Sequence, residues 1–478
     1  MRESKSVFMT QSFDAIVIGT GQAGPPLVRR LVAAGMKVAV IERAKFGGTC
    51  VNTGCIPTKT MVASAYAAHM ARSAGQFGIN ISGNITVDMK QVKARKDLIS
   101  GQSRDGLEKS LKGLKDCTVF QGHARFEAPH EISVGDVRLE ADKIFINVGG
   151  RAFVPPVAGL DGIEYLTNSG MMNVDFLPRH LAIAGGSYIG LEFGQMFRRF
   201  GSQVTILERG ARLIAQEDED VSDTVREILE NEGIEILLNA ECKRVAKSGG
   251  GVLISAEVAG KAREIEASHI LFAVGRQPNT DDLGLDKAGI KKDARGYIGV
   301  DDQLRTNVEG VWAMGDCNGK GAFTHTSYND FEIVAANLLD NDPRRVSDRI
   351  LTYGLFIDPP LGRAGMTNAQ VLKSGRKAMV GQRPMTKIAR AVEKGESQGF
   401  MRVVVDADTK EILGATVLGP GGDEVVHSVL DMMYAKKPYT VIQRAMHIHP
   451  TVSELIPTIL GELKPLEAAP SVNAKGVA

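Results

Sequence analysis

Residues 47–59 read GGTCVNTGCIPTK and place Cys50 and Cys55 five positions apart. In an ideal α-helix two such residues lie roughly 8–9 Å apart, which exceeds the Cα separation of roughly 7 Å that a disulfide spans. The two sulfurs can therefore pair only if the backbone between them is irregular. Asn52, Thr53 and Gly54 tolerate turns and permit such a distortion.

A regular helix is expected just beyond this distortion. Pro57 can be its first residue, because a proline at that position sacrifices no hydrogen bond. A thiol close to the start of a helix ionises more easily. The spacing alone leaves two interpretations open: a reversible, catalytic dithiol/disulfide pair, or two unrelated buried cysteines, a common environment for this residue.

The composition predicts a soluble, enzyme-like chain. Its 478 residues are too many for one core and suggest about three domains. The 57 Lys and Arg against 56 Asp and Glu give a net charge of +1, so the charge balance gives no reason to expect binding to nucleic acid or an anionic membrane. Five scattered cysteines, a start without an apolar signal core, and no stretch of roughly 20 apolar residues favour a cytoplasmic protein.

A dinucleotide-binding pattern surrounds residues 19–24 (GTGQAG). Residues 13–19 form a short apolar run, an amphipathic segment reaches Ala34, and residues 37–41 form a second apolar run that ends at Glu42. This order predicts a βαβ unit whose glycines let the backbone approach a pyrophosphate at a helix N-terminus, while the acid accepts from a ribose hydroxyl. A plain turn is the alternative for the glycines alone.

The same pattern recurs around residues 185–190 (GGSYIG), followed by a helix-like stretch to Phe200 and an apolar run that ends at Glu208. Glu42 follows Gly24 by 18 residues, and Glu208 follows Gly190 by the same interval. The agreement predicts two nucleotide sites of one design. Ser187 stands where the middle glycine is expected and adds a side chain there.

The rest of the chain predicts further strands and helices, and a third domain. We expect a solvated helix over 87–114, short strands over 117–148, a linker at 155–156, a buried strand over 270–276, a strand over 306–316, and a third domain from about residue 351. Asp316, at the exit of one strand, could bind sugar hydroxyls of an extended cofactor or belong to an ordinary Gly-Asp turn. No Cys/His cluster has zinc spacing, so no metal site is predicted.

Residues 447–454 (HIHPTVSE) form the last segment whose residues suggest a catalytic role. One interpretation is a capping box, with Thr451 as N-cap and Glu454 at the third position of a helix over 455–463. The other is that Glu454 also orients His449 and tunes it as a general acid/base. Both can hold together.

With these parts assembled, the chain resembles the class I pyridine nucleotide-disulfide oxidoreductases, which include dihydrolipoamide dehydrogenase, glutathione reductase and mercuric reductase. The resemblance covers roughly residues 13–465 and depends on GTGQAG, GGTCVNTGCIPTK, GGSYIGLE, AVGRQPN, TNVEGVWAMGD and HIHPTVSE, which occur in the family's order. It implies an α/β fold with two Rossmann-like domains and a C-terminal α+β domain. The implied boundaries are 1–152 with 281–347 for FAD, 153–280 for NAD(P), and 348–478 for the dimer interface.

The resemblance also implies the binding residues. Those for FAD are Gly19, Gly21, Gly24, Glu42, Gly48, Thr49, Lys59, Ala124, Asp316 and Thr324. Those for the nicotinamide nucleotide are Gly185, Tyr188, Gly190, Glu208 and Gly275. Glu208 favours NAD, because a carboxylate repels a 2′-phosphate, while the nearby Arg209 and Arg212 leave NADP as the less favoured alternative.

The resemblance also implies the catalytic residues, which are Cys50, Cys55, Lys59, Glu192, His449 and Glu454. In this family Cys55 would be the thiolate that faces the flavin, and Cys50 the thiol that attacks substrate. Lys59 would pair with Glu192, and Tyr188 would occupy the place of a gating tyrosine. His449 would come from the other subunit of a homodimer and exchange the proton of Cys50.

The substrate is less well defined by the motifs. CIPTK with HxHPTxxE favours a small dithiol/disulfide, as in dihydrolipoamide dehydrogenase. FTHTSYNDFEIV and IDPPLGRAGMT favour the alternative, a mercuric-reductase-like reductase of Hg(II), Cu(II) or quinone that lacks the C-terminal cysteine pair. The family's usual Ala-Thr-Gly before the linker is here Asn147-Val148-Gly149, a departure from the pattern.

Overall fold

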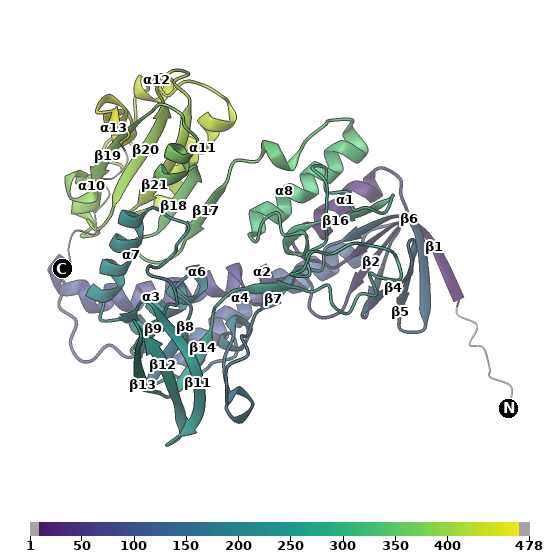
Figure 1. Cartoon of the computed structure of the whole chain (residues 1–478), viewed down its shortest axis with the longest axis horizontal. Helices are drawn as coiled ribbons and strands as arrows, with labels where there is room; N and C mark the ends of the chain where they lie inside the picture. Colours follow the sequence, from purple (N-terminus) through teal and green to yellow (C-terminus); the bar gives the residue numbers. More distant parts are fainter. Residues whose placement is uncertain (1–8, 468–478) are drawn as a thin grey trace, which may run out of the picture. The chain divides into compact units, whose positions relative to one another are not determined.

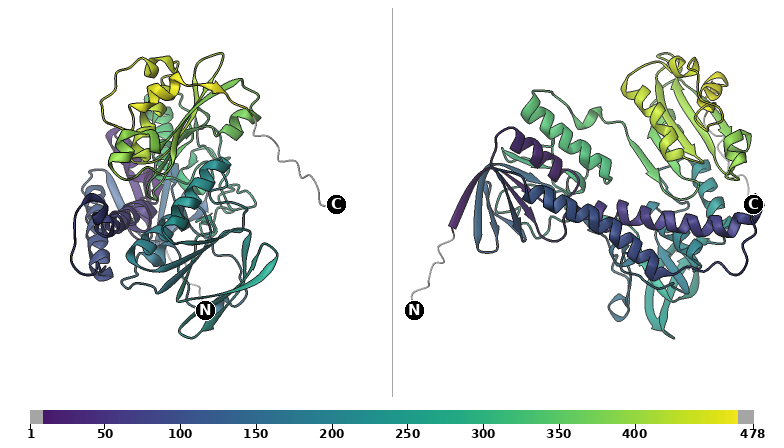
Figure 2. Two further views of the ribbon diagram at one scale, coloured as in Figure 1. Left: turned by 90° about the vertical axis from the view of Figure 1, so that its left-hand side faces the viewer. Right: turned by 180° about the vertical axis from the view of Figure 1, so that it is seen from behind.

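The computed structural model describes residues 9–467, which form two compact units (Figure 1, Figure 2). Unit 1 contains the residues up to 156 together with 164–177 and 270–349, and unit 2 contains 157–163, 178–269 and the residues from 350 onward. Residues 1–8 of the leader and 468–478 of the tail lie outside the described residues. The division into three domains stays a prediction.

A mixed seven-stranded sheet forms the centre of unit 1. Its strand order is β3-β2-β1-β6-β5-β4, and β16 also pairs with β6. The strands are β1 (Met9–Ile18), β2 (Val38–Glu42), β3 (Cys117–Gln121), β4 (Ala124–Ala128), β5 (Glu131–Val134), β6 (Val137–Ile146) and β16 (Val311–Ala313). β1, β2, β3, β6 and β16 pair in parallel, whereas β4 and β5 pair in antiparallel fashion.

Strand β1 is buried on both faces of this sheet, which explains its unbroken apolar run. Ile16 and Ile18 enter one apolar cluster, and Ala15 and Val17 enter another with Leu27 of helix α1 (Gly24–Ala33). Helix α1 contacts α8 (Thr324–Ala335), and α3 (Cys55–Ser73) runs beside α4 (Met89–Lys112) (Figure 2). The first glycine motif therefore joins a central strand to a packed helix.

Unit 2 contains a parallel βαβ element and two antiparallel sheets. The parallel strands are β8 (His180–Ala184), β9 (Gln203–Leu207) and β10 (Glu235–Leu237), with helices α6 (Tyr188–Phe200) and α7 (Glu219–Asn231). A three-stranded sheet contains β11 (Ala240–Ser248), β12 (Gly251–Val258) and β13 (Lys261–Ala267). As in the first glycine motif, a short loop leads from a buried strand into a helix.

The C-terminal part of unit 2 is a six-stranded sheet covered by helices. Its order is β17 (Thr352–Leu355), β18 (Leu361–Gly365), β21 (Ile412–Leu418), β20 (Phe400–Asp406), β19 (Ala378–Pro384) and β22 (Lys464–Pro465). Helix α11 (Gly422–Tyr434) packs on β18 and β21, and α9 (Asn368–Lys373), α10 (Ala389–Glu393), α12 (Thr440–Gln443) and α13 (Leu455–Gly461) complete this part. Every residue of β20 and β21 is buried.

Three predicted elements differ from the structure. β1 begins at Met9 rather than at Phe13, because residues 9–12 continue the pairing with β6. The strand expected over 270–276 is split into β14 (His269–Phe272) and β15 (Arg276–Pro278), and β15 pairs with β7 (Gly150–Ala152). The strand expected over 306–316 is only β16, and Asp316 lies in the 3₁₀ turn Gly315–Asn318.

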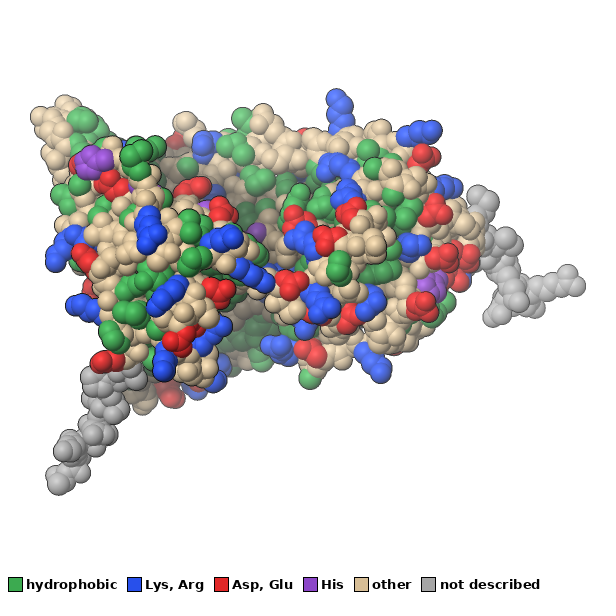
Figure 3. Space-filling view, turned by 90° about the horizontal axis from the view of Figure 1, so that it is seen from above, with side chains coloured by type: hydrophobic (Ala, Val, Ile, Leu, Met, Phe, Trp, Pro, Cys, Tyr) green, Lys and Arg blue, Asp and Glu red, His purple; other side chains and the backbone are tan. Residues whose placement is uncertain are grey.

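Between residues 9 and 467 the structure contains no helix that is both long and apolar enough to cross a membrane. Figure 3 shows acidic and basic side chains interspersed over the face in view. This mixture agrees with the near-zero net charge of the chain.

Phe145→Ala should destabilise unit 1 by roughly 3–5 kcal/mol, because a fully buried ring is replaced by a cavity. Phe145 is 0% exposed, and its ring stacks on Trp312 of the paired strand with centroids 4.9 Å apart. Trp312 is the single tryptophan of the chain, so its fluorescence follows the urea unfolding of this unit. Phe77→Ala, at an exposed ring, is the control, and equal stabilities of the two variants would contradict the prediction.

Candidate active site

The two cysteines lie on either side of a break between two helices. Cys50 is in α2 (Gly48–Asn52), and Cys55 is the first residue of α3. Gly54 between the helices has φ −132° and ψ −119°, and a Cβ there would lie 2.9 Å from the carbonyl oxygen of Thr49. The side chains of Cys50 and Cys55 hydrogen-bond to each other. The predicted irregular backbone is confirmed, and it brings the two sulfurs together.

Helix α3 begins at Cys55, two residues before the expected start at Pro57. The proline is still in the first turn, where an amide hydrogen has no partner within the helix. The correction matters chemically, because Cys55 is now at the positive end of a 19-residue helix. That position favours the thiolate form of Cys55.

Thr324, the first residue of α8, places its hydroxyl oxygen 3.0 Å from the Cys55 sulfur. The hydrogen bond with Cys55 and burial raise the pKa of the Cys50 thiol. Cys50 therefore keeps its proton and needs a base to become a nucleophile. Thr324 was expected only as an FAD residue, and no sequence signal pointed to its contact with the dithiol.

Two asparagines hold the segment that carries the dithiol: Asn52, expected only to tolerate a turn, and Asn168, which the sequence analysis did not single out. The Asn52 amide donates to the carbonyl oxygens of Phe46 at 2.8 Å and Gly48 at 2.9 Å. Asn168 donates to the Thr53 carbonyl at 3.0 Å, in the break itself. The bond from Asn168 satisfies the Thr53 carbonyl at the interruption, and the bonds from Asn52 tie the end of α2 back to its start.

The first glycine motif forms a turn with no room for side chains. Gly19 has φ +101°, and a Cβ there would lie 2.3 Å from the carbonyl oxygen of Asn147. A Cβ at Gly24 would lie 2.4 Å from the carbonyl oxygen of Gly19. Gly48 is adjacent as well, since its Cβ would lie 3.0 Å from Gly21 Cα. The bare backbone at the N-terminus of α1 fits the pyrophosphate of FAD.

Glu42 ends β2 beside this turn, as predicted. Its carboxylate accepts from the Thr20 amide at 3.0 Å, the Thr20 hydroxyl at 2.6 Å and the Ala44 amide at 2.9 Å. The carboxylate is thus fixed next to the glycine turn. The role of Thr20 was missed, because the fingerprint leaves the residue between the first two glycines unspecified.

Asn147 shows what the departure from Ala-Thr-Gly does. Its amide nitrogen donates to the carbonyl oxygens of Gly19 and Gly21, each at 3.2 Å. The departure therefore adds two hydrogen bonds to the glycine turn, from the residue that directly follows strand β6.

The remaining predicted FAD residues are spread over unit 1. Asp316 forms an ion pair with Arg276 at 3.2 Å, and the preceding amide of Gly315 donates to Asp330 at 2.7 Å. Thr49 lies in α2, Lys59 lies in α3, and Ala124 pairs with Val134 between β4 and β5. Their contacts with FAD stay predictions.

The second glycine motif repeats the backbone of the first. Gly185 has φ +117°, and a Cβ at Gly190 would lie 2.0 Å from its carbonyl oxygen. The Glu208 carboxylate accepts from the amides of Gly186 and Gly210, each at 2.6 Å. Ser187 is the N-cap residue of α6, a position that serine favours. The Ser187 side chain makes no capping hydrogen bond, but the close-packed glycine backbone of the turn fits a second dinucleotide.

The residues expected near the nicotinamide lie in both units. Tyr188 begins α6, and Gly275, with φ +138°, separates β14 from β15. Glu192 is 4% exposed and accepts from the Phe356 amide at 3.0 Å. Lys59 belongs to unit 1 and Glu192 to unit 2, so their pairing stays a prediction.

His449 and Glu454 are in contact. Nδ1 of His449 lies 3.0 Å from each carboxylate oxygen of Glu454, and the ring is 74% exposed. The predicted capping box is only half formed. Thr451 accepts from the Glu454 amide at 3.2 Å, but α13 begins at Leu455, and Thr451 is not its N-cap. The carboxylate of Glu454 is turned to the imidazole instead.

Comparisons with known proteins agree with this arrangement. The sequence model of pyridine nucleotide-disulphide oxidoreductases matches residues 13–330, and that of the family's dimerisation domain matches residues 352–459. The probable pyridine nucleotide-disulfide oxidoreductase RclA of Escherichia coli is 35% identical over 460 residues, which cover 95% of this chain and 99% of the relative. A dihydrolipoyl dehydrogenase of Chlamydia muridarum is 31% identical and covers 94% of this chain and 96% of its own.

A solved structure is similar over nearly the whole chain. It is the Cu(II) complex of the HOCl-induced flavoprotein disulfide reductase RclA from Escherichia coli, with a TM-score of 0.87, 34% identity, and coverage of 95% of this chain and 100% of the other. The resemblance and the fold class drawn from the motifs are confirmed. This chain belongs to the pyridine nucleotide-disulphide oxidoreductase family, as an FAD-dependent flavoprotein with a dimerisation domain.

Proposed function

We propose that the protein passes electron pairs between a nicotinamide nucleotide, FAD and the Cys50/Cys55 pair, and through that pair to or from a small dithiol/disulfide. The single observation that carries the proposal is the hydrogen-bonded pair of sulfurs at the N-terminus of α3. The reducing cytoplasm, expected from the five scattered cysteines, suits a disulfide that cycles.

When bound, FAD supplies the transfer of an electron pair between the nicotinamide and the disulfide. The reduced pair then acts by thiol–disulfide exchange. The Cys50 thiolate attacks one sulfur of the substrate and releases the first substrate thiol. Cys55 attacks the sulfur of Cys50, closes the Cys50–Cys55 disulfide and releases the second. The substrate gains two electrons and two protons, and the dithiol loses them.

His449 would move the proton in this exchange. The raised pKa of Cys50 means that its thiol needs a base. Glu454 occupies Nδ1 of His449, which leaves Nε2 to take the proton of Cys50 and return it to the leaving thiolate. We propose that this is His449 of the partner subunit, so that the active site is complete only in a homodimer. The match to a dimerisation domain over residues 352–459 supports the dimer.

NAD is the proposed nucleotide. Glu208 directly follows β9 beside the glycine turn, where its negative charge opposes a 2′-phosphate. NADP is the alternative, because Arg209 and Arg212 follow in the same loop.

A second candidate function is the reduction of a metal ion or another oxidant, such as Cu(II), Hg(II) or a quinone. The similarity to a reductase solved as a Cu(II) complex favours it. Among residues 9–467, no group of three or more His, Cys, Asp or Glu is arranged to hold a metal ion. In this candidate the metal ion or oxidant is the substrate, and the Cys50/Cys55 dithiolate would reduce it directly.

Cys50→Ser should abolish lipoamide-dependent oxidation of NADH, because the attacking sulfur is lost. The reaction is followed by NADH absorbance with the FAD-loaded protein. Cys117→Ser, at a half-buried cysteine of β3, is the control and should keep the parent rate. Full lipoamide activity in Cys50→Ser would refute the proposal. A parent protein that reduces Cu(II) or Hg(II) but not lipoamide, and that loses this metal reduction in Cys50→Ser, would instead favour the second candidate.

His449→Ala should lower disulfide turnover by about 10²–10⁴-fold, the usual effect of losing a general acid/base. Glu454→Gln should have a smaller effect, since it removes only the charge that orients the ring. His447→Ala is the matched control, because that ring contacts the carbonyl of Ala445, two residues away. If His449→Ala and His447→Ala turn over alike, His449 is not the acid/base.

Glu208→Arg should shift the preference from NADH towards NADPH, because attraction replaces repulsion at the 2′-position. The ratio of kcat/KM for the two nucleotides measures the shift. Glu257→Arg, on β12 of the same unit, makes the same charge change outside the loop and should leave the ratio unchanged. An unchanged ratio in Glu208→Arg would rule out its contact with the ribose.

A further inference from the structure

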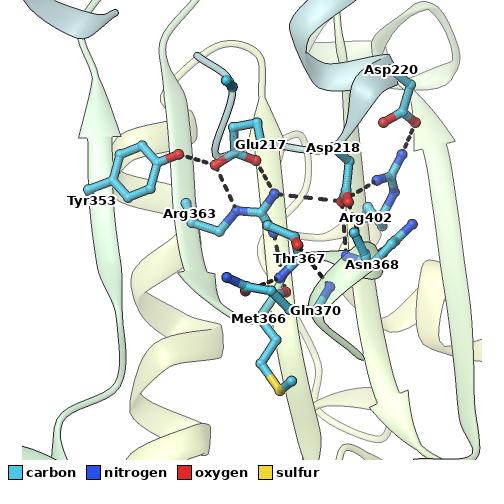
Figure 4. Close-up of polar contacts among 12 residues, drawn as sticks. Glu217, Asp218, Asp220, Tyr353, Arg363, Met366, Thr367, Asn368, Gln370 and Arg402 are labelled. Atoms are coloured by element: carbon cyan, nitrogen blue, oxygen red, sulfur yellow. Dashed lines mark hydrogen bonds and ion pairs between the residues drawn. The ribbon is translucent and has the colours of Figure 1, made fainter. Parts of the chain in front are cut away.

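A buried ion pair joins two distant segments of unit 2 (Figure 4). Glu217 precedes α7 and Arg363 lies in β18, and their side chains are 1% and 2% exposed. The Arg363 guanidinium donates to both Glu217 oxygens, one through Nε at 3.1 Å. The hydroxyl of Tyr353 in β17 also donates to Glu217. Burial and the charge of Glu217 raise the pKa of this phenol, so it keeps the proton that it donates.

The next residues are attached to the same C-terminal sheet. Asp218 accepts from the amides of Asn368 at 3.0 Å and Ala369 at 3.1 Å, at the start of α9, and from Arg402 at 3.2 Å. Arg402 in β20 also pairs with Asp220 (Figure 4). Residues 217–220 are therefore held at several points. Glu217, Asp218 and the two arginines are buried, whereas Asp220 is 49% exposed.

The loop held in this way is the one that follows Glu208. Ile214 within it has φ +37°, in the left-handed region, which is strained for a β-branched residue. Its amide donates to the carbonyl of Gly186 at 3.0 Å, and its own carbonyl accepts from the Glu217 amide at 2.8 Å. The strained residue thus lies between the glycine turn and the buried ion pair.

We propose that Glu217, Arg363 and Tyr353 are positioning residues that hold the 209–216 loop, and with it the second glycine turn, in the shape that receives the nicotinamide nucleotide. This inference depends on the proposed dinucleotide site at Gly185–Gly190 and Glu208. A strained conformation persists only where its surroundings impose it. The buried ion pair holds the chain directly after the loop and so imposes the strained conformation. The residues that pair with Glu217 come from strands more than a hundred residues later in the sequence.

The physical consequence concerns nucleotide binding. Without the anchor, Ile214 can relax to an ordinary φ, and the hydrogen bond from its amide to Gly186 is lost. The nucleotide must then order the loop and the turn as it binds, which weakens its affinity. Once the nucleotide is bound, the loop has its native shape, so kcat at saturating NADH stays near that of the parent.

The test uses the dimeric, FAD-loaded protein with Tyr353→Phe and Glu217→Gln. Tyr353→Phe removes one hydroxyl and keeps the ion pair, so it remains informative if Glu217→Gln fails to fold. The KM for NADH and the Kd of NAD⁺ by calorimetry should rise about 2- to 30-fold, the range for residues that act through another. Amide exchange over residues 209–216 should become faster. Tyr434→Phe, whose hydroxyl accepts from the Ile350 amide at 3.2 Å, is the matched control.

Unchanged Kd and KM in folded Tyr353→Phe and Glu217→Gln would overturn the inference, as would a fall in kcat with no change in Kd. A rise in Kd equal to that in Tyr434→Phe would also overturn it. Binding of NAD⁺ needs no disulfide substrate. A parent protein that binds NAD⁺ but reduces no disulfide would therefore refute the proposed function, while the change in Kd between variants still decides this inference. A parent that binds neither NAD⁺ nor NADP⁺ would refute both.

Discussion

The contact between two sulfurs across an interrupted helix is the constraint on which the rest of this protein depends. A continuous helix would hold Cys50 and Cys55 too far apart to react. The interruption at Thr53 and Gly54 brings them together, and it also makes Cys55 the first residue of a long helix. One change of backbone direction thus supplies both proximity and a field that favours a thiolate. The asparagines that bond to the interrupted backbone make this arrangement stable.

The two glycine turns solve the same steric problem in two units. In each, the last glycine of the motif lies against the carbonyl of the first, at a distance that no Cβ could occupy. Both turns share one brace: Glu42 accepts from the Thr20 amide of the first, and Glu208 accepts from the Gly186 amide of the second. The other braces differ, because Asn147 bonds to the first turn and the strained loop after Glu208 bonds to the second. The two glycine turns therefore have similar backbone conformations but are held by partly different hydrogen bonds.

Much of the fold could be predicted, because its signals are local. Strand, glycines, helix and acid occur in order within about thirty residues, and the structure has both βαβ units where the sequence placed them. Features that depend on distant residues could not be predicted. The bond between Thr324 and Cys55, and the pair of Glu217 and Arg363, join residues that no motif relates. The start of α13 at Leu455 was predicted correctly, but its N-cap is Glu454 rather than Thr451, and the carboxylate of Glu454 contacts His449 instead of completing the capping box.

The pairing of β16 with β6 has a consequence for biosynthesis. β6 ends at Ile146, but the strand that covers part of its edge spans Val311–Ala313. At the usual pace of translation, about 5–20 residues per second, roughly ten to thirty seconds separate their emergence from the ribosome. During that interval the nascent chain exposes an unpaired strand edge, which is prone to aggregation. The sheet is completed only after the residues between Ile146 and Val311 have been synthesised, including the βαβ element of unit 2.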